Sequence, residues 1–396
     1  MVRTLDDLEV EGAALGVRVD INSPLDEDLE LADDARLRAH VDTIEELTDR
    51  DGRVVVLAHQ GRPGGDEFGT LSPHAERLGD LLDTPVEYCD ATFSSDARRA
   101  VEELEQGATL LLENTRFYSE EYMSLEPIVA AETFLVSKLS TVLDAYVNDA
   151  FAASHRSQPS LVGFPERLPS YAGRVMEAEL DVLGNIGSSP EPRIYVLGGA
   201  KVDDAIDVAR SVLERGLATA VLTAGIVGNA FLLADGVSLG AASAAVVNER
   251  SHEAVRRAGD LLESYHHRIH MPRDVGIERN GSRIELDLDE LPAAEPAMDI
   301  GARTVAAYAE ILEDAGTVIL NGPAGVYENS LFEVGTRELY QSATRAEMSI
   351  VGGGDTAAAL RELGIEGFDH VSTGGGAALR MLTGDPLPAV EALESS

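Results

Sequence analysis

Residues 193–225 read RIYVLGGAKVDDAIDVARSVLERGLATAVLTAG, two short apolar runs on either side of a longer amphipathic segment. The two runs have the length and β-branched content of buried strands, and the segment between them has helical periodicity. Similar runs recur along the chain: VRVDI (17–21), RVVVLA (53–58), TLLLEN (109–114), TVLDAYVN (141–148), TVILNGP (317–323), MSIVGGG (348–354) and FDHVSTGGG (368–376). This alternation predicts parallel sheets with crossover helices, which is an α/β fold.

A chain of 396 residues is too long for one ordinary core and predicts two domains. The best candidate boundary is the stretch Gly184–Pro192, which is rich in Pro, Gly and Ser and follows an amphipathic segment at 171–183. We therefore expect two doubly wound, Rossmann-like parallel-sheet domains joined by a helical hinge. The first domain would span 1–172, and the hinge helix with the second domain would span 173–379.

The charge balance is strongly acidic, with 31 Lys plus Arg against 70 Asp plus Glu and a formal net charge of -39. Only two of these cations are lysines, Lys138 and Lys201. Such a field repels nucleic acid, and 44% hydrophobic residues exclude a disordered acidic tail. The composition fits a halophilic protein, because the Debye length of ~3 Å at 1 M salt screens the self-repulsion.

A single cysteine, Cys89, excludes an internal disulfide and a cysteine-cluster zinc site. The N-terminal residues are acidic and lack the apolar run of a signal peptide, so we expect a cytoplasmic protein. The uncharged stretch Ala218–Ala234 is shorter than the ~20 apolar residues of a spanning helix. It is better interpreted as a buried strand and helix, with no membrane contact.

The residues that follow the expected strands differ between the two halves, and ligands of parallel sheets bind at these strand ends. The first half has polar and largely cationic residues there: Asp20, Asn22, His59, Arg62, Asn114, Arg116, Asn148, Asp149, His155 and Arg156. The second half has glycine clusters: Gly198, Gly199 and Lys201; Gly225; Asn321, Gly322 and Pro323; Gly352, Gly353, Gly354 and Asp355; and Gly374, Gly375 and Gly376.

Arginine and histidine at strand ends suit a small, multiply charged anion, because guanidinium groups bind phosphate and carboxylate oxygens in a fork geometry. Glycine turns at helix N-termini suit nucleotide phosphates, because the backbone N–H groups can approach closely. A phosphorylated small molecule opposite a nucleotide indicates phosphoryl transfer. Two domains indicate closure that expels water from the reaction.

Two nucleotide-binding motifs compete for the glycine clusters. The P-loop pattern is absent, because neither lysine has the required glycines and hydroxyl. Gly352, Gly354 and Ala357 match GxGxxG/A after a strand, which would fit an NAD(P)-dependent dehydrogenase. Asp355 argues against this, because its carboxylate would repel a bare pyrophosphate. It could instead cap the helix and hold a magnesium ion carried by a nucleotide, although a simple helix cap is the alternative. Lys201 follows a glycine turn and could neutralise a phosphate.

Eight motifs in register resemble the phosphoglycerate kinase family, in its haloarchaeal type, over nearly the whole chain. They are RVDINSPL (18–25), AHQGRP (58–63), LLENTRFY (111–118), YVNDAFAASHR (146–156), LGGAKV (197–202), NGPAGVYE (321–328), GGGDTAAAL (352–360) and VSTGGGAAL (371–379). The resemblance implies a cytoplasmic, monomeric kinase of glycolysis and gluconeogenesis. It would transfer a phosphoryl group reversibly between 1,3-bisphosphoglycerate and ADP, giving 3-phosphoglycerate and ATP.

The resemblance also implies residue roles. Phosphoglycerate would bind to Asp20, Asn22, Arg36, His59, Arg62, Arg116 and Arg156, with His155 adjacent. The nucleotide would bind to Lys201, Asn321, Glu328, Gly353, Gly354, Asp355 and Thr356. Glu328 would contact the ribose, Asp355 the Mg²⁺ on the phosphates, and residues 225–231 the adenine. Arg36 and Lys201 would be catalytic, and residues 380–396 would return to the first domain.

One position departs from the family pattern. The family usually has a second lysine in GAKVxDK, where this chain has Ala205. Either Arg36 and the helix N-terminus near Gly374–Gly376 stabilise the transition state without it, or turnover is reduced. Two alternative functions remain at this point: an NAD(P)-dependent dehydrogenase and a noncatalytic nucleotide-binding relative.

Overall fold

A computed structural model describes residues 2–26 and 28–396, and the chain divides into two compact units. Unit 1 extends to Asp181 and also includes Pro386–Ser396, whereas unit 2 comprises Val182–Asp385. The first division falls inside a helix, α8 (Arg174–Gly184), and not at the expected position 172/173. Residue Tyr171, expected at the start of that helix, lies instead in a strand, β6.

Unit 1 is built on a six-stranded sheet in the order β3-β4-β2-β1-β5-β6, with every pair parallel. The strands are β1 (Ala14–Arg18), β2 (Arg53–Leu57), β3 (Val86–Cys89), β4 (Thr109–Leu112), β5 (Ala145–Asn148) and β6 (Ser170–Ala172). All residues of β1, β4 and β5 are buried, which explains why these strands are continuous apolar runs.

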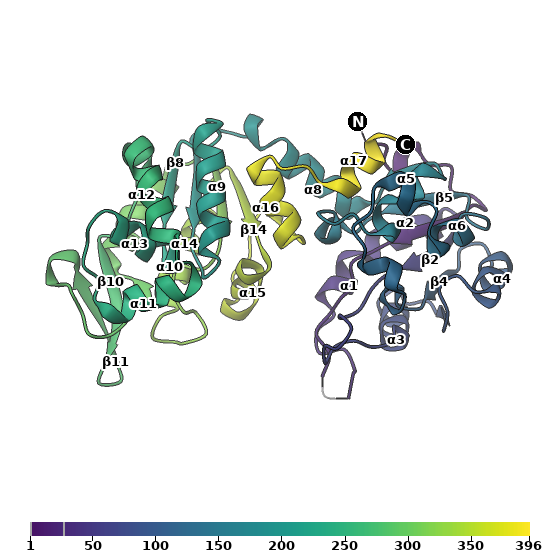
Figure 1. The fold of residues 1–396 in the computed structure, drawn as a ribbon, viewed down its shortest axis with the longest axis horizontal. Helices are drawn as coiled ribbons and strands as arrows, with labels where there is room; N and C mark the ends of the chain where they lie inside the picture. Colours follow the sequence, from purple (N-terminus) through teal and green to yellow (C-terminus); the bar gives the residue numbers. More distant parts are fainter. Residues whose placement is uncertain (1, 27) are drawn as a thin grey trace. The chain divides into compact units, whose positions relative to one another are not determined.

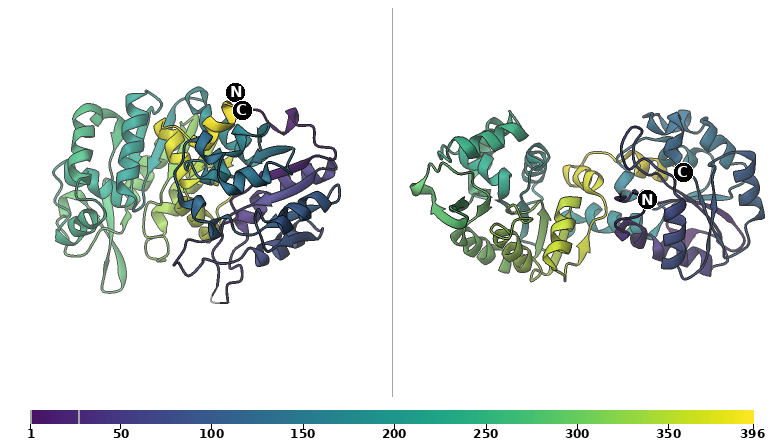
Figure 2. Two further views of the ribbon diagram at one scale, coloured as in Figure 1. Left: turned by 45° about the vertical axis from the view of Figure 1, so that its right-hand side comes forward. Right: turned by 90° about the horizontal axis from the view of Figure 1, so that it is seen from below.

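Helices cover both faces of this sheet (Figure 2). The α-helices of unit 1 are α1 (Ala35–Ala39), α2 (Val41–Asp49), α3 (Ser72–Leu81), α4 (Ser95–Glu103), α5 (Pro127–Ala130), α6 (Phe134–Leu139), α7 (Pro159–Val162) and α17 (Pro388–Glu394). Short 3-10 helices are η1 (Leu5–Asp7), η2 (Thr115–Phe117), η3 (Ser119–Tyr122), η4 (Phe151–Ala153) and η5 (Phe164–Glu166).

The C-terminal helix α17 is part of unit 1. Its Ala389 and Ala392 belong to a buried cluster with Ala130, Leu161 and Val162, and the two chain termini lie side by side in Figures 1 and 2. The segment that returns to unit 1 begins at Pro386 and not at 380, because residues 380–383 still belong to the last helix of unit 2.

Unit 2 has a second six-stranded parallel sheet, in the order β15-β14-β13-β7-β8-β9. Its strands are β7 (Arg193–Leu197), β8 (Ala220–Thr223), β9 (Ile269–His270), β13 (Thr317–Asn321), β14 (Met348–Gly352) and β15 (His370–Val371). Its helices are α9 (Val202–Glu214), α10 (Gly225–Ala234), α11 (Ala241–Arg250), α12 (Ala254–Tyr265), α13 (Ala302–Glu313), α14 (Val334–Ala343), α15 (Gly354–Leu363) and α16 (Gly375–Thr383), with η6 (Ile186–Ser188), η7 (His266–Arg268) and η8 (Leu288–Glu290).

The expected architecture of two doubly wound parallel-sheet domains is confirmed. The uncharged stretch Ala218–Ala234 forms the buried strand β8 and the helix α10, also as expected. None of the helices formed by residues 2–26 and 28–396 has the length and apolarity needed to span a membrane.

One small sheet was not expected. Strands β10 (Asp274–Arg279), β11 (Ser282–Asp287) and β12 (Asp299–Ile300) form an antiparallel sheet in the order β11-β10-β12, and the β10–β11 hairpin extends from unit 2 in Figure 1. Asn280 and Gly281 form its turn with φ values of 55° and 73°. An Asn-Gly pair is the strongest short-range hairpin signal, so the sequence did contain the information.

Candidate active site

In unit 1 the end of β1 presents a buried carboxylate. Asp20 is 8% exposed, and its Oδ2 accepts a hydrogen bond from Nη1 of Arg36 at 2.9 Å. Burial by itself favours the neutral acid. The positive charges of Arg36 and Arg18, with a hydrogen bond from the N–H of Asn22, outweigh burial and hold the pKa of Asp20 at about 2. Asp20 is therefore ionised at neutral pH.

The next strand along the chain, β2, is followed by His59, which is 3% exposed. Nη2 of Arg18 lies 2.8 Å from Nδ1 of His59. Because a guanidinium only donates, Nδ1 must accept and the imidazole proton must be on Nε2. Burial, followed by the charge of Arg18, lowers the pKa of His59 well below its usual value. His59 is therefore a neutral imidazole with Nε2–H as its donor.

Arg116, which follows β4, is 5% exposed and is held by a 2.6 Å bond from its Nη1 to the carbonyl of Gly61. Its Nε is buried and makes no hydrogen bond with any described residue. Burial, with the charges of Arg156 and Arg18, lowers the pKa of Arg116 to about 10. A buried donor that has no partner among residues 2–26 and 28–396 is suited to an anionic ligand.

Arg156 and Arg62 complete the same region. Burial lowers the pKa of Arg156, and the nearby positive charges of Arg18, Arg62 and Arg36 lower it further. The negative charge of Asp20 acts in the opposite direction and raises this pKa. Nε of Arg156 donates to Nε2 of His155 at 3.3 Å. Like-charged groups influence one another in this way only when they lie close together.

The structure thus brings together the seven predicted residues of unit 1. Asn22 is joined to the group through its Oδ1, which accepts from the N–H of Gly61 at 2.7 Å. We call the set the arginine cup: Arg18, Asp20, Asn22, Arg36, His59, Arg62, Arg116 and Arg156. Five arginines around one carboxylate are suited to an anion with several charges.

Two supports of the cup were not assigned a role from sequence. Arg18 is 0% exposed and donates to Oγ of Ser160 at 3.0 Å as well as to His59. A cation within the otherwise apolar start of the run 17–21 was the available signal. Asn114 is also buried; its Oδ1 accepts from the N–H groups of Gln60 and Arg116, so it joins the loops after β2 and β4.

In unit 2 the ends of β7 and β13 approach so closely that both need glycine. A Cβ at Gly198 would lie 2.3 Å from the carbonyl oxygen of Pro323, and one at Gly322 would lie 2.2 Å from that of Gly198. Beside them is a cavity of about 270 Å³, here called the glycine pocket. It is lined by Gly198, Gly199, Ala200, Lys201, Asp204, Asn321, Gly322, Gly353, Asp355, Thr356, Gly375, Gly376 and Leu379.

Lys201 and Asp355 are the charged pair of this pocket. Nζ of Lys201 lies 2.9 Å from Oδ2 of Asp355, and both side chains are 62% exposed. Asp355 lies in the first turn of α15, whose N-cap is Gly353 with φ 95°, so the aspartate is not the helix cap. Both charges are therefore accessible to a ligand.

Of the other residues predicted to bind the nucleotide, Asn321 and Thr356 line the glycine pocket and Gly354 does not. Nδ2 of Asn321 is buried and has no hydrogen-bond partner in the part of the chain that the structure describes. The hydroxyl of Thr356 donates to the carbonyl of Gly352 at 2.9 Å and accepts from the N–H of Gly322 at 2.7 Å, so it holds two loops together. Gly354 begins α15 but does not line the glycine pocket.

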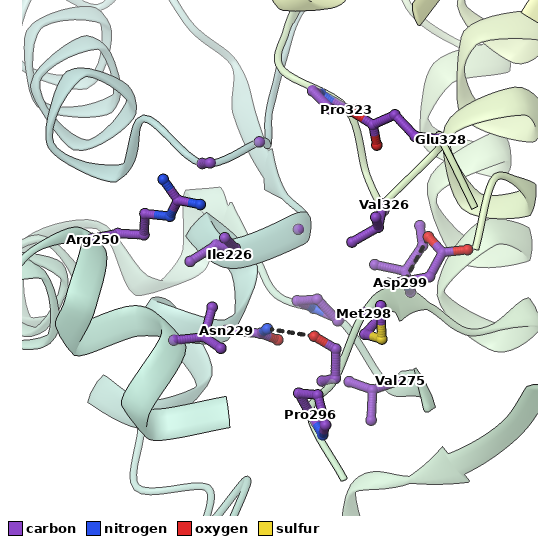
Figure 3. A pocket seen from close by; sticks show the side chains of 18 residues that line it. Ile226, Asn229, Arg250, Val275, Pro296, Met298, Asp299, Pro323, Val326 and Glu328 are labelled. Carbon is purple, nitrogen blue, oxygen red and sulfur yellow. Dashed lines mark hydrogen bonds between the residues drawn. The ribbon is translucent and has the colours of Figure 1, made fainter. Parts of the chain in front are cut away.

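A second cavity of about 370 Å³, the apolar pocket, shares Gly199 and Ala200 with the glycine pocket. Figure 3 shows Glu328 and Val326 on one side, opposite Ile226 and Arg250. The lining is completed by Gly225, Asn229, Val246, Pro272, Val275, Pro296, Ala297, Met298, Asp299, Ile300, Pro323 and Gly325. An apolar cavity that adjoins the glycine pocket at Gly199 and Ala200 is suited to a nucleoside beside its phosphates.

The lining of the apolar pocket agrees only in part with the expected adenine contacts at residues 225–231. Gly225 and Asn229 line it as expected, but Phe231 is buried in the core and does not. Arg250 was not expected; it lies at the end of α11, and no pattern in the sequence distinguished it from surface arginines. Asp299 is a buried residue of the pocket lining, and burial raises its pKa to about 6. Hydrogen bonds from Gly335 and Arg283 lower this pKa but do not outweigh burial.

Comparisons with known proteins agree with this geometry. The family model described as phosphoglycerate kinase matches residues 5–385. The phosphoglycerate kinase of Natronomonas pharaonis is 77% identical over 99% of this chain and 100% of its own length, and that of Halobacterium salinarum is 61% identical over 99% of each. The crystal structure of phosphoglycerate kinase from Pyrococcus horikoshii OT3 superposes with a TM-score of 0.93 at 40% identity, covering 100% of this chain and 98% of its own. None of these matches supports a dehydrogenase or a noncatalytic relative, and the chain belongs to the phosphoglycerate kinase family.

Proposed function

We propose that the arginine cup binds 3-phosphoglycerate or 1,3-bisphosphoglycerate, and that the glycine and apolar pockets bind ATP or ADP with its magnesium ion. As a phosphoglycerate kinase, the chain is a phosphotransferase with a carboxyl group as acceptor, an enzyme of glycolysis. The observation that carries the assignment of the cup is the gathering of Arg18, Arg36, Arg62, Arg116 and Arg156 in a protein of net charge -39.

The donors of the cup match the groups of phosphoglycerate. The unpaired Nε of Arg116 and the Nε2–H of His59 are directional donors for phosphate or carboxylate oxygens. Arg62 and Arg36 are exposed, so they remain accessible to a ligand. Asp20 keeps Arg36 in place and offers acceptor oxygens to the hydroxyl group of the substrate.

The donor set of the glycine pocket fits a magnesium nucleotide. Asp355 supplies an accessible carboxylate, which is a ligand that Mg²⁺ prefers. Asn321 supplies a buried amide whose Nδ2 has no hydrogen-bond partner among the described residues. When bound, magnesium would neutralise charge on the phosphate oxygens. Nucleotide binding would exchange the Lys201–Asp355 pair for two others, with Lys201 on the phosphates and Asp355 on the metal.

The reaction needs no covalent enzyme intermediate. In the direction of ATP use, a carboxylate oxygen of 3-phosphoglycerate attacks the γ-phosphorus, the bond to the β,γ-bridging oxygen breaks, and ADP leaves. Arg36 and Lys201 would stabilise the charge on the three equatorial oxygens, which is electrostatic and positional catalysis. Because the two ligands must meet away from water, we expect both to favour closure of the two units.

Further proposals concern the oligomeric state of the protein, its place in the cell and its need for salt. We propose a cytoplasmic monomer that needs molar salt. Support for the salt requirement comes from the charge of -39 and from the haloarchaeal relatives.

The test is a coupled assay that follows ADP formation from ATP, Mg²⁺ and 3-phosphoglycerate, first in high salt and then after dialysis into dilute buffer. We expect turnover that depends on all three components and is lost in dilute buffer. The assignment of substrates fails if ADP forms without 3-phosphoglycerate. The salt requirement fails if activity and melting temperature survive the dialysis unchanged.

A further inference from the structure

His40 is a buried residue between α1 and α2 that none of the proposed ligand contacts uses. It is 3% exposed. Its Nε2 accepts a hydrogen bond from the backbone N–H of Asp20 at 3.1 Å, and its Nδ1 lies 2.7 Å from Oδ2 of Asp149. A backbone N–H only donates, so Nε2 carries no proton and Nδ1–H donates to the aspartate. His40 is therefore held as one neutral tautomer by both neighbours.

Asp149 extends this chain of bonds to the helix in which the two units divide. It is 0% exposed, and its Oδ1 accepts from the backbone N–H groups of Val175 at 2.9 Å and Met176 at 3.4 Å. These residues form the first turn of α8. A Cβ at Gly173 would lie 2.2 Å from Oδ1 of Asp149, so glycine is required for this approach. The carboxylate satisfies N–H groups that a helix N-terminus leaves without partners.

The other end of the chain of bonds is the arginine cup. The short helix α1 contacts Asp20 twice: Arg36 binds its carboxylate at 2.9 Å, and His40, which directly follows α1, binds its backbone N–H. Asp20 thus lies between a residue that would contact the substrate and one that contacts α8 through Asp149. Every bond in this series lies within unit 1, and Asp20, His40 and Asp149 are buried, which strengthens the interactions among these three residues.

We infer that His40 is a positioning residue that couples occupancy of the arginine cup to α8. The inference rests on the proposed function, in which the cup binds phosphoglycerate through Arg36. Ligand contacts to Arg36 change its bond to Asp20, and the rigid series Asp20–His40–Asp149 passes this change to the first turn of α8. An imidazole suits this role because it accepts on one side and donates on the other across a fixed ring.

The test compares His40→Ala and His40→Gln with a matched control, His74→Ala. His74 is also a buried histidine of unit 1, with its Nε2 3.1 Å from Oε1 of Gln60, but it makes no bond to Asp149 or α8. Two quantities are measured in high salt: the dissociation constant of 3-phosphoglycerate by calorimetry and kcat in the coupled assay. We expect His40→Ala to lower kcat at least tenfold while the dissociation constant changes less than threefold, and His40→Gln to recover part of kcat.

A merely structural role would lower the melting temperature in His40→Ala and His74→Ala alike, with equal effects on kcat. That result, or a native kcat in His40→Ala, overturns the inference. If His40→Ala does not fold, the ¹⁵N spectrum of the native enzyme decides: the inference requires a protonated Nδ1 and an unprotonated Nε2 in His40, and the opposite tautomer refutes it. Failure of the proposed function is distinguishable, because then the native protein itself does not bind 3-phosphoglycerate.

Discussion

Replacing Lys201 by alanine should remove most of the turnover and leave the fold intact. The side chain is 62% exposed, and the ion pair with Asp355 at 2.9 Å is the contact that it would lose. An exposed ion pair contributes about 0 to 1 kcal/mol to stability. For a domain of this size that corresponds to a fall in melting temperature of at most about 4 °C.

The effect on the reaction should be much larger than the effect on stability. A positive charge placed in advance at the transferring phosphoryl group is worth roughly 3 to 4 kcal/mol, because the charge it stabilises develops in the transition state. At about 1.4 kcal/mol for each factor of ten, kcat should fall roughly a hundredfold or more.

The assay measures kcat in the coupled system and the melting temperature, both in high salt. Lys138→Ala is the matched control, because Lys138 is the only other lysine of the chain, is exposed on α6 and lies outside the pockets. We expect it to retain native turnover. The reasoning is refuted if Lys201→Ala keeps at least a third of the native kcat, or if both variants lose activity equally.

Two further predictions concern the buried residues Asp20 and Ala205. Because the pKa of Asp20 falls from 3.8 in the unfolded chain to about 2 in the fold, Asp20→Asn should lower the free energy of unfolding by about 2 kcal/mol at neutral pH, from about 1.4 kcal/mol per pKa unit. This stability is fully present above pH 3.8 and is lost as the pH falls through about 2. In urea denaturation, the difference in unfolding free energy between the native protein and Asp20→Asn should therefore shrink as the pH is lowered. A difference that stays constant with pH would contradict this prediction. Ala205 is 2% exposed on α9, so Ala205→Lys should lower the melting temperature without a large gain in kcat, because Gly375 and Gly376 place the N-terminus of α16 in the glycine pocket. A large gain would mean that nothing replaces the family's second lysine.

Strand-end residues were the most predictable part of the site. The rule that parallel strands share one carboxyl edge is independent of side-chain detail, so Asp20, His59 and Arg116 could be grouped from sequence alone. The fine roles could not be predicted in this way. Thr356 was expected to bind the nucleotide, but the bonds by which its hydroxyl joins two loops were not foreseen, and neither was the pairing of Asp355, expected at the Mg²⁺, with Lys201.

Other features depend on contacts between distant parts of the chain. The role of Arg18 requires knowing that β1 and β2 are neighbours, since its partner His59 is 41 residues away. His40 and Asp149 are 109 residues apart, and no local pattern connects them. By contrast, the β10–β11 hairpin has a local Asn280–Gly281 signal and was predictable.

The most direct test of the arginine cup is calorimetric titration of Arg62→Ala and native protein with 3-phosphoglycerate and, separately, with magnesium ADP. Arg62 is exposed and close enough to Arg116 and Arg156 to lower their pKa values, so it can be removed without emptying a packed core. We predict at least tenfold weaker binding of 3-phosphoglycerate and unchanged binding of the nucleotide. Equal affinity of both proteins for 3-phosphoglycerate would contradict the assignment of this cluster as its binding site.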